Sequence, residues 1–268
     1  MSIRKTAVAG QFYPAKAEEI RQLFQHYNKS LEAHLKEHTL LSLKPRAVIV
    51  PHAGYVYSAF TANIAMRLLA NGTPDCVVVI GPSHRVFLKG TSLCEYECYE
   101  TPLGTLKADQ KVISALQERF ALSCLPEAHK EHSTEVQMPF IKYYLPEASV
   151  VELVYGEESP TRLSEIIDFL LEKPECAVVI STDLSHYYAI DKANRLDSIC
   201  LDAVQKRSPQ VLHQGCEACG KIGVEAMLLS AKKRGLKPIL LDYRTSADAS
   251  GDTTQVVGYM SAGFTEEE

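Results

Sequence analysis

Short, continuous apolar runs between amphipathic segments constrain the fold more than any other feature of this chain. The runs AVIV, CVVVI, SVVELVY and CAVVIS, at residues 47–50, 76–80, 149–155 and 176–181, are rich in valine and isoleucine. Strands of this kind are buried on both faces, and their alternation with helices is typical of parallel sheets covered by helices. The pattern predicts an α/β fold, namely a three-layer α/β/α sandwich with a central mixed, mostly parallel sheet.

The segments between these runs have the spacing of amphipathic helices. After residue 132 a helix is expected with Ser133 or Thr134 as N-cap and with Gln137 completing a capping box. The chain shows no internal repeat, and its 268 residues, 1–268, suit one large domain or two small ones. Other helices are expected near residues 15–37, 58–69, 159–173, 190–206 and 220–234, and closing strands near 237–246 and 253–264.

Composition excludes several classes of function. The formal net charge is -5 and the isoelectric point is near 6.0, so the chain lacks the basic footprint of a protein that binds nucleic acid or an anionic membrane. It contains neither an apolar run of the roughly 18 residues that a membrane span needs nor the apolar region of a secretory signal. We therefore expect a cytoplasmic protein, with no nucleic-acid or membrane partner, in which most of the eight cysteines are free thiols.

Imidazole and carboxylate side chains follow three of the predicted strands. His52 follows AVIV, His84 follows CVVVI, and Asp183 and His186 follow CAVVIS. Ligands of open α/β sheets bind beyond the carboxyl ends of the strands, so one site is expected there. Neutral imidazoles in this position can bind a transition metal. Each histidine alone could instead be a half-buried, hydrogen-bonded side chain, but their recurrence beside proline-containing turns favours a metal site.

Other residues near these strand ends are candidates for acid–base chemistry. Asp183 and His186 are three residues apart and could face the same way on a helical turn, with Asp183 orienting His186 or a metal-bound water. Asp183 could instead cap the next turn. His132 precedes an expected helix and could act as an acid–base group or bind an anion, or it could simply satisfy the loop backbone.

Cys216 and Cys219 form a C-x-x-C motif. Without a second pair the motif is not a zinc ribbon, and a thioredoxin-like role lacks the usual preceding strand. Cys219 lies where a helix is expected to begin, which favours the thiolate and makes it a candidate third metal ligand or nucleophile. Cys216 is interpreted as a bystander. The remaining histidines are expected to be solvated: His26, His34, His38, His129 and His213.

Seven motifs occur in a characteristic order: GQFYP, VPHAGYVYSA, IGPSH, EHSTEVQMPF, STDLSHY, ACGKIGV and SGDTTQVVGYMSAGF. Together they resemble the Memo family, whose prokaryotic members are called AmmeMemoRadiSam system protein B. The resemblance covers nearly the whole chain and implies a single Memo-like domain with a fold similar to class III extradiol dioxygenases. It also implies a metal-binding trio of His52, His84 and Cys219, with His132, Asp183 and His186 in the same pocket.

The resemblance favours iron as the metal, whereas an imidazole–thiolate set suits zinc or copper equally well. Cys219 replaces the carboxylate of the two-histidine, one-carboxylate triad that the related dioxygenases use. The leading hypothesis is a cytosolic metalloprotein that is redox-active or oxygen-reactive, such as a metal-dependent oxidoreductase. The alternatives are a peptide- or protein-binding module that uses the same pocket, and a zinc-dependent hydrolase. The family name implies AMMECR-type and radical-SAM proteins as partners, and residues 248–252 could form a lid.

Overall fold

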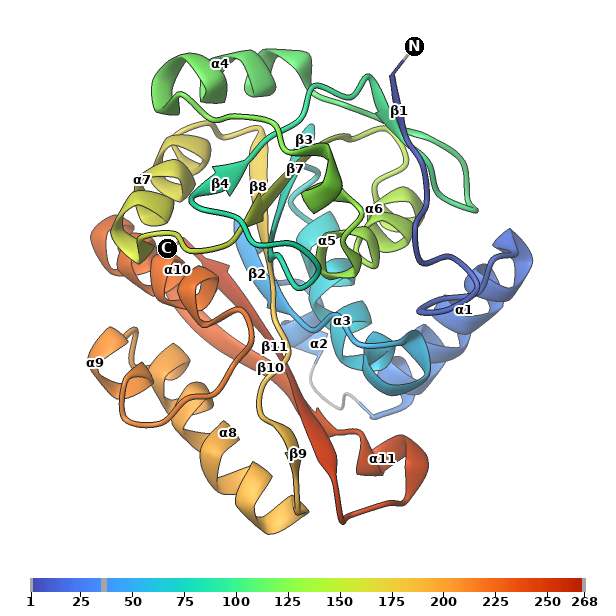
Figure 1. Cartoon of the computed structure of the whole chain (residues 1–268). Coiled ribbons are helices and arrows are strands. Elements are labelled where there is room, and N and C mark those ends of the chain that lie inside the picture. Colours follow the sequence, from blue (N-terminus) through green and yellow to red (C-terminus); the bar gives the residue numbers. More distant parts are fainter. Residues whose placement is uncertain (1, 35–37, 267–268) are drawn as a thin grey trace.

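His52, His84 and Asp183 follow strands of the central sheet, and the computed structural model describes residues 2–34 and 38–266 (Figure 1). Four strands lie side by side and parallel in the middle of this sheet. They are β2 (Ala47–Val50), β8 (Cys176–Ser181), β3 (Cys76–Pro82) and β7 (Ser149–Tyr155), in that order. The predicted ranges of β2, β7 and β8 are confirmed, because continuous apolar runs read directly as strands buried on both faces.

Antiparallel strands complete the sheet at both edges and make it mixed, as predicted. Beyond β2 lies β11 (Val256–Thr265), which pairs antiparallel with β2, with the long edge strand β10 (Lys237–Thr245) and with the short β9 (His186–Tyr188). At the other edge β4 (Thr91–Ser92) pairs antiparallel with β7.

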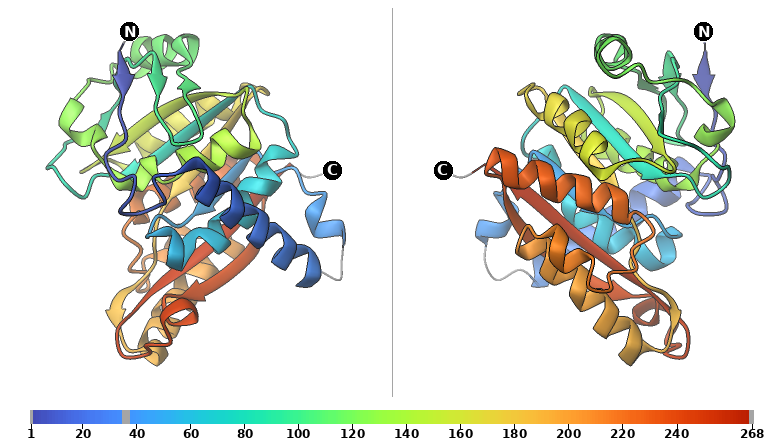
Figure 2. Two further views of the ribbon diagram at one scale, coloured as in Figure 1. Left: turned by 90° about the vertical axis from the view of Figure 1, so that its right-hand side faces the viewer. Right: turned by 60° about the vertical axis from the view of Figure 1, so that its left-hand side comes forward.

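Helices cover both faces of the sheet, which confirms the three-layer arrangement (Figure 2). One layer contains α1 (Ala17–His34), α3 (Tyr55–Ala70) and α6 (Met138–Tyr144). The other contains α4 (Gln110–Phe120), α7 (Pro160–Leu171), α8 (Ile190–Gln205) and α10 (Lys221–Arg234). Alternate residues of one strand serve the two layers: Val48 and Val50 of β2 belong to the core of the first, and Ala47 and Ile49 to the core of the second.

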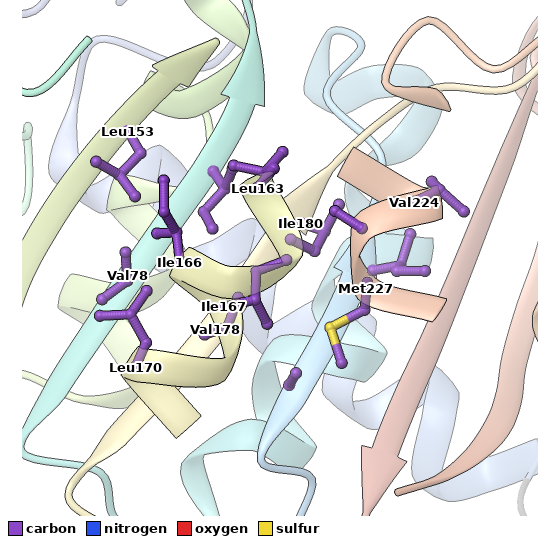
Figure 3. Close-up of a cluster of buried hydrophobic side chains, with 14 of the residues drawn as sticks. Val78, Leu153, Leu163, Ile166, Ile167, Leu170, Val178, Ile180, Val224 and Met227 are labelled. Atoms are coloured by element: carbon purple, nitrogen blue, oxygen red, sulfur yellow. The ribbon is translucent and has the colours of Figure 1, made fainter. Parts of the chain in front are cut away.

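The second layer packs tightly on the strands through branched side chains. Figure 3 shows Ile166 and Leu170 of α7, and Met227 of α10, gathered with Val78 of β3 and Val178 of β8. All five side chains have no measurable exposure to solvent. Burial of a large aliphatic side chain contributes roughly 1.5–3 kcal/mol, so this core holds the strand ends in place.

Several short elements escape a periodicity-based prediction because each contains only two to four residues. A second, three-stranded sheet contains β1 (Ile3–Arg4), β5 (Cys98–Tyr99) and β6 (Leu106–Lys107). The other short elements are α2 (His38–Leu41), a 3-10 helix at Pro126–His129, α5 (His132–Glu135), α9 (Pro209–Leu212) and α11 (Ala247–Ser250). None of the helices in the described ranges is long and apolar enough to cross a membrane.

The expectation that most cysteines are free thiols is wrong for half of them. Disulfides join Cys94 to Cys124 and Cys200 to Cys216, whereas the thiols of Cys76, Cys98, Cys176 and Cys219 are free. The Cα atoms of the two pairs are 4.6 and 4.9 Å apart, within the span that a disulfide bridges. Cys216 therefore pairs with a cysteine of α8 and is no bystander. Composition could not reveal these pairs, because the fold alone brings the partners together.

Candidate metal centre

Three imidazoles from distant parts of the chain meet at the carboxyl ends of the parallel strands. His52 follows β2, His84 follows β3, and His132 is the first residue of α5. The ring centroid of His52 lies 5.1 Å from that of His84 and 5.4 Å from that of His132. The ring centroids of His84 and His132 are 4.8 Å apart. One ligand atom from each residue lies within 4.8 Å of the others, so the cluster could hold a metal ion.

The buried carboxylate of Glu131 organises two of these rings, and it was not predicted from the sequence. Glu131 is the N-cap of α5, and its side chain accepts hydrogen bonds from the backbone N–H groups of His132 and Ser133. It also accepts the N–H of His84 at 2.6 Å. Its Oε1 lies 2.7 Å from Nδ1 of His132 and 3.3 Å from Nδ1 of His84. Burial opposes the charged carboxylate, but hydrogen bonds from His132 and His84 hold its pKa well below the usual range.

The ionised carboxylate decides which nitrogen of each ring carries the proton. Glu131 can only accept hydrogen bonds, so Nδ1 of His84 and Nδ1 of His132 are the donors. In the neutral form of each ring, the Nε2 atom then keeps a free lone pair. A carboxylate that fixes the tautomer in this way is the usual support of a metal-binding histidine.

A serine hydroxyl sets the tautomer of His52. The Ser181 hydroxyl donates its single proton to the carbonyl of Ser133, and Nδ1 of His52 lies 3.0 Å from the same oxygen. The Ser181 oxygen must therefore accept the Nδ1 proton of His52, which leaves Nε2 unprotonated. Burial, reinforced by the neighbouring rings of His84 and His132, lowers the pKa of His52 well below its ordinary value. In all three residues Nδ1 is thus engaged by a fixed partner, and Nε2 is the ring nitrogen left to bind a metal.

Cys219 meets this cluster on the side of His52. Its Sγ lies 3.2 Å from Nε2 of His52 and accepts the backbone N–H of Asp183 at 3.2 Å. Burial and the nearby Asp183 carboxyl raise the pKa of the thiol to about 12. Without a cation the sulfur is therefore protonated at neutral pH, whereas a bound metal would displace its proton.

Asp183 and His186 lie beside the same cluster but not on a helical turn, so that expectation is wrong. Residues 182–185 are an irregular connection from β8 to β9. The Asp183 carboxylate accepts the backbone N–H of His52 at 2.7 Å, and burial raises its pKa. Both residues line a cavity of about 490 Å³, together with His132. Ser250 and Asp252, from the segment expected to form a lid, also line it.

The structure also tests the predictions made for the helix cap and for the remaining histidines. Ser133 and Thr134 do not cap α5, because their hydroxyls donate to the carbonyl of Pro82 and to Glu152. His129 is buried, not solvated, and its ring contacts Ser92 and Glu152. His26 and His213 are exposed, as predicted. The side chains of His34 and His38 lie outside the described residues.

Comparison with known proteins identifies the family. The family model described as Memo-like protein matches residues 4–263 of this chain. The chain belongs to the Memo family. A MEMO1 family protein of Thermotoga sp. (strain RQ2) is 33% identical over 97% of this chain and 98% of its own length. MEMO1 family proteins of Sulfolobus acidocaldarius and Aquifex aeolicus are 33% and 32% identical over 98% of this chain, and over 99% and 100% of their own lengths. Full-length similarity of this kind confirms the resemblance carried by the seven motifs.

In this Memo-family chain, Glu131→Gln is expected to weaken metal binding about 10–100-fold, the usual effect of losing a carboxylate that orients metal-binding histidines. The amide keeps the shape of the side chain but loses the charge that holds two Nδ1 protons in place. Competition titration with a metal chelator measures the change. Glu127→Gln is the matched control, because this exposed carboxylate precedes the same helix and should leave the affinity unchanged. Equal affinities for the two variants would contradict the role assigned to Glu131.

Proposed function

We propose that this protein binds a divalent transition metal between its three imidazoles and uses it in a redox or oxygen-dependent reaction on a small molecule. The supporting observation is that Nδ1 of each ring is engaged by a fixed partner, while the candidate ligand nitrogens lie within 4.8 Å of one another. Family resemblance favours iron, and the donor set also suits zinc and copper. A bound ion of this kind supplies Lewis acidity and, for iron or copper, electron transfer.

We assign four residues to the metal: His52, His84, His132 and Cys219. The sequence motifs indicate His52, His84 and Cys219, and the 3.2 Å approach of Sγ to His52 supports that trio. His132, predicted to be an acid–base group, is assigned here as a ligand because its ring lies 4.8 Å from that of His84. The variants His132→Ala and Cys219→Ser separate the two contributions in a metal titration.

Asp183 and His186, the remaining predicted site residues, lie on the side of the cluster that faces the cavity. Asp183 holds the backbone of His52 through its carboxylate, and it lines the cavity beside His186. We assign to His186 the transfer of protons to and from a bound molecule, because its imidazole is partly exposed and lines the cavity. Asp183 is assigned a positioning role.

Location and partners follow from the family resemblance. We propose a cytoplasmic protein that works with AMMECR-type and radical-SAM proteins. Two disulfides are unusual for this location, because intracellular disulfides are rare except in hyperthermophiles, where they are common.

Elemental analysis of protein purified without added metal, combined with oxygen-uptake measurements, tests the proposed function. Iron or copper in near-stoichiometric amount, with uptake that stops on chelation, is the expected result. A zinc-loaded protein that consumes no oxygen would replace this proposal with a zinc-dependent hydrolase. Protein that holds no metal after reconstitution, yet still binds a peptide partner in chelator, would replace it with a binding module.

A further inference from the structure

We propose that the cavity beside the imidazole cluster selects a small ligand that carries an aromatic ring and a positively charged group. This inference rests on the proposed function, because the ligand would occupy the cavity that adjoins the metal cluster. The cavity volume of about 490 Å³ falls within the range of small-molecule sites. Its lining runs from the buried Asp183 and Tyr259 to the exposed Tyr187 and Asp252, so a ligand can enter from solvent and reach the imidazoles.

Aromatic side chains form much of the lining. The ring of Phe12 lies 4.6 Å from that of His132 with an interplanar angle of 33°. Tyr57 and Tyr187 also line the cavity, although 42% and 70% of their surfaces remain exposed. Large aromatic side chains that stay exposed beside a cavity offer faces on which a planar ring can pack.

The backbone of Tyr187, at an irregularity in the pairing of β9 with β11, holds this ring at the cavity. Its φ angle is +62°, in the left-handed region that bulky residues rarely adopt. Such conformations cost about 1–3 kcal/mol and cluster at ligand-binding sites. Here β9 pairs with β11 on both sides of Tyr187, through His186 and Tyr188, and so keeps the tyrosine in this conformation.

The charges around the cavity favour a cation. Asp183 and Asp252 line it, and none of its described lining residues is a lysine or an arginine. Two cations from neighbouring segments contact aromatic rings: Arg244 stacks 4.0 Å from the ring of Phe60, and Lys192 lies 3.7 Å from the ring of Tyr188. A phosphate or carboxylate on the exposed part of a ligand would therefore meet no lysine or arginine of the lining.

Asp252 is the residue that would recognise the positive group. Its Oδ1 accepts hydrogen bonds from the backbone N–H and the hydroxyl of Thr254, at 2.8 and 2.7 Å, which keep the carboxylate in one orientation at the exposed rim. An ammonium group beside this carboxylate could also contact the faces of the exposed tyrosines, as cations do in aromatic cages.

Isothermal titration of the metal-loaded protein with two matched probes tests the inference. Tyramine and 4-hydroxyphenylacetate carry the same phenol ring with opposite charges on a short tail. We expect tyramine to bind at least about 10-fold more tightly, in line with a carboxylate and aromatic faces acting on one cation. Asp252→Asn should remove most of this preference and Tyr187→Ala should weaken both probes, whereas the exposed Asp191→Asn, outside the cavity, should change neither.

The metal content of the same samples separates this inference from the proposed function. A fully metal-loaded protein that binds neither probe, or that binds both equally, overturns the ligand class and leaves the metal site standing. A protein without metal that still prefers tyramine through Asp252 supports the ligand class and overturns the proposed function. A preference that persists unchanged in Asp252→Asn rejects the recognition role of that carboxylate.

Discussion

Replacing Arg4 with methionine will lower the free energy of unfolding by about 3–5 kcal/mol, the usual cost of removing one partner from a buried ion pair. The Arg4 side chain is only 5% exposed and forms a salt bridge with Glu135. It also lies 3.7 Å from Glu152, and both carboxylates are buried. Methionine fills much of the same volume but leaves these carboxylates without their cation.

Denaturant unfolding followed by circular dichroism measures this change. Lys5→Met is the matched control, because the adjacent Lys5 pairs with Glu100 in solvent and should contribute less than about 1 kcal/mol. The double variant Arg4→Met with Glu135→Gln should recover part of the loss, since it removes one uncompensated charge. Similar losses for Arg4→Met and Lys5→Met would show that the buried pair does not stabilise the fold.

The Arg4 network also reaches the metal cluster. Arg4 donates a hydrogen bond of 3.1 Å to the backbone carbonyl of Glu131, and Glu135 belongs to the same short helix, α5, as His132. The Glu135 carboxylate accepts in addition the N–H groups of Ala7 and Val8. The N-terminal segment therefore fixes the helix that carries one imidazole of the cluster.

His52→Ala will lower the metal affinity by about 100- to 1000-fold. Tightly held zinc ions bind with roughly 10–16 kcal/mol through four ligands, which corresponds to about 2.5–4 kcal/mol for each ligand. His52 is 2% exposed and is the imidazole that also contacts Cys219, so its loss removes one ligand and the support of another. Chelator competition, with metal content measured after gel filtration, gives the affinity.

His213→Ala is the matched control for this variant. His213 is an exposed histidine whose ring pairs with Glu225 at 3.0 Å and is not part of the cluster, so its removal should leave the metal affinity unchanged. Metal content and affinity of His52→Ala equal to those of His213→Ala would reject the imidazole cluster as the metal site.

Local sequence patterns were sufficient to predict the sheet and the edge that carries the site. Residues 149–155 and 176–181 were predicted as strands with the bounds that β7 and β8 have. Because parallel strands end at a common edge, the positions of His52, His84 and Asp183 after three such strands predicted their proximity. The register, in which Val50 pairs with Ser181, brings these strand ends level.

Pairings between distant segments could not be predicted in this way. Glu131 looks like an ordinary loop carboxylate in the sequence, and only the contact of its loop with the end of β3 brings His84 to it. Glutamate is not among the preferred N-cap residues, so its position before the helix gave no capping signal either. The burial of His129 beside Glu152 likewise has no local signal.

The sequence by itself therefore determined the layered α/β architecture, the family and the strand edge where the candidate residues lie. These depend on apolar periodicity and short motifs, which neighbouring residues encode. Only the tertiary structure decided which imidazoles form one cluster, which nitrogen of each ring is free, and which cysteines pair. Those properties depend on hydrogen bonds and packing between residues that are far apart in the chain, as in the 131-residue separation between His52 and Asp183.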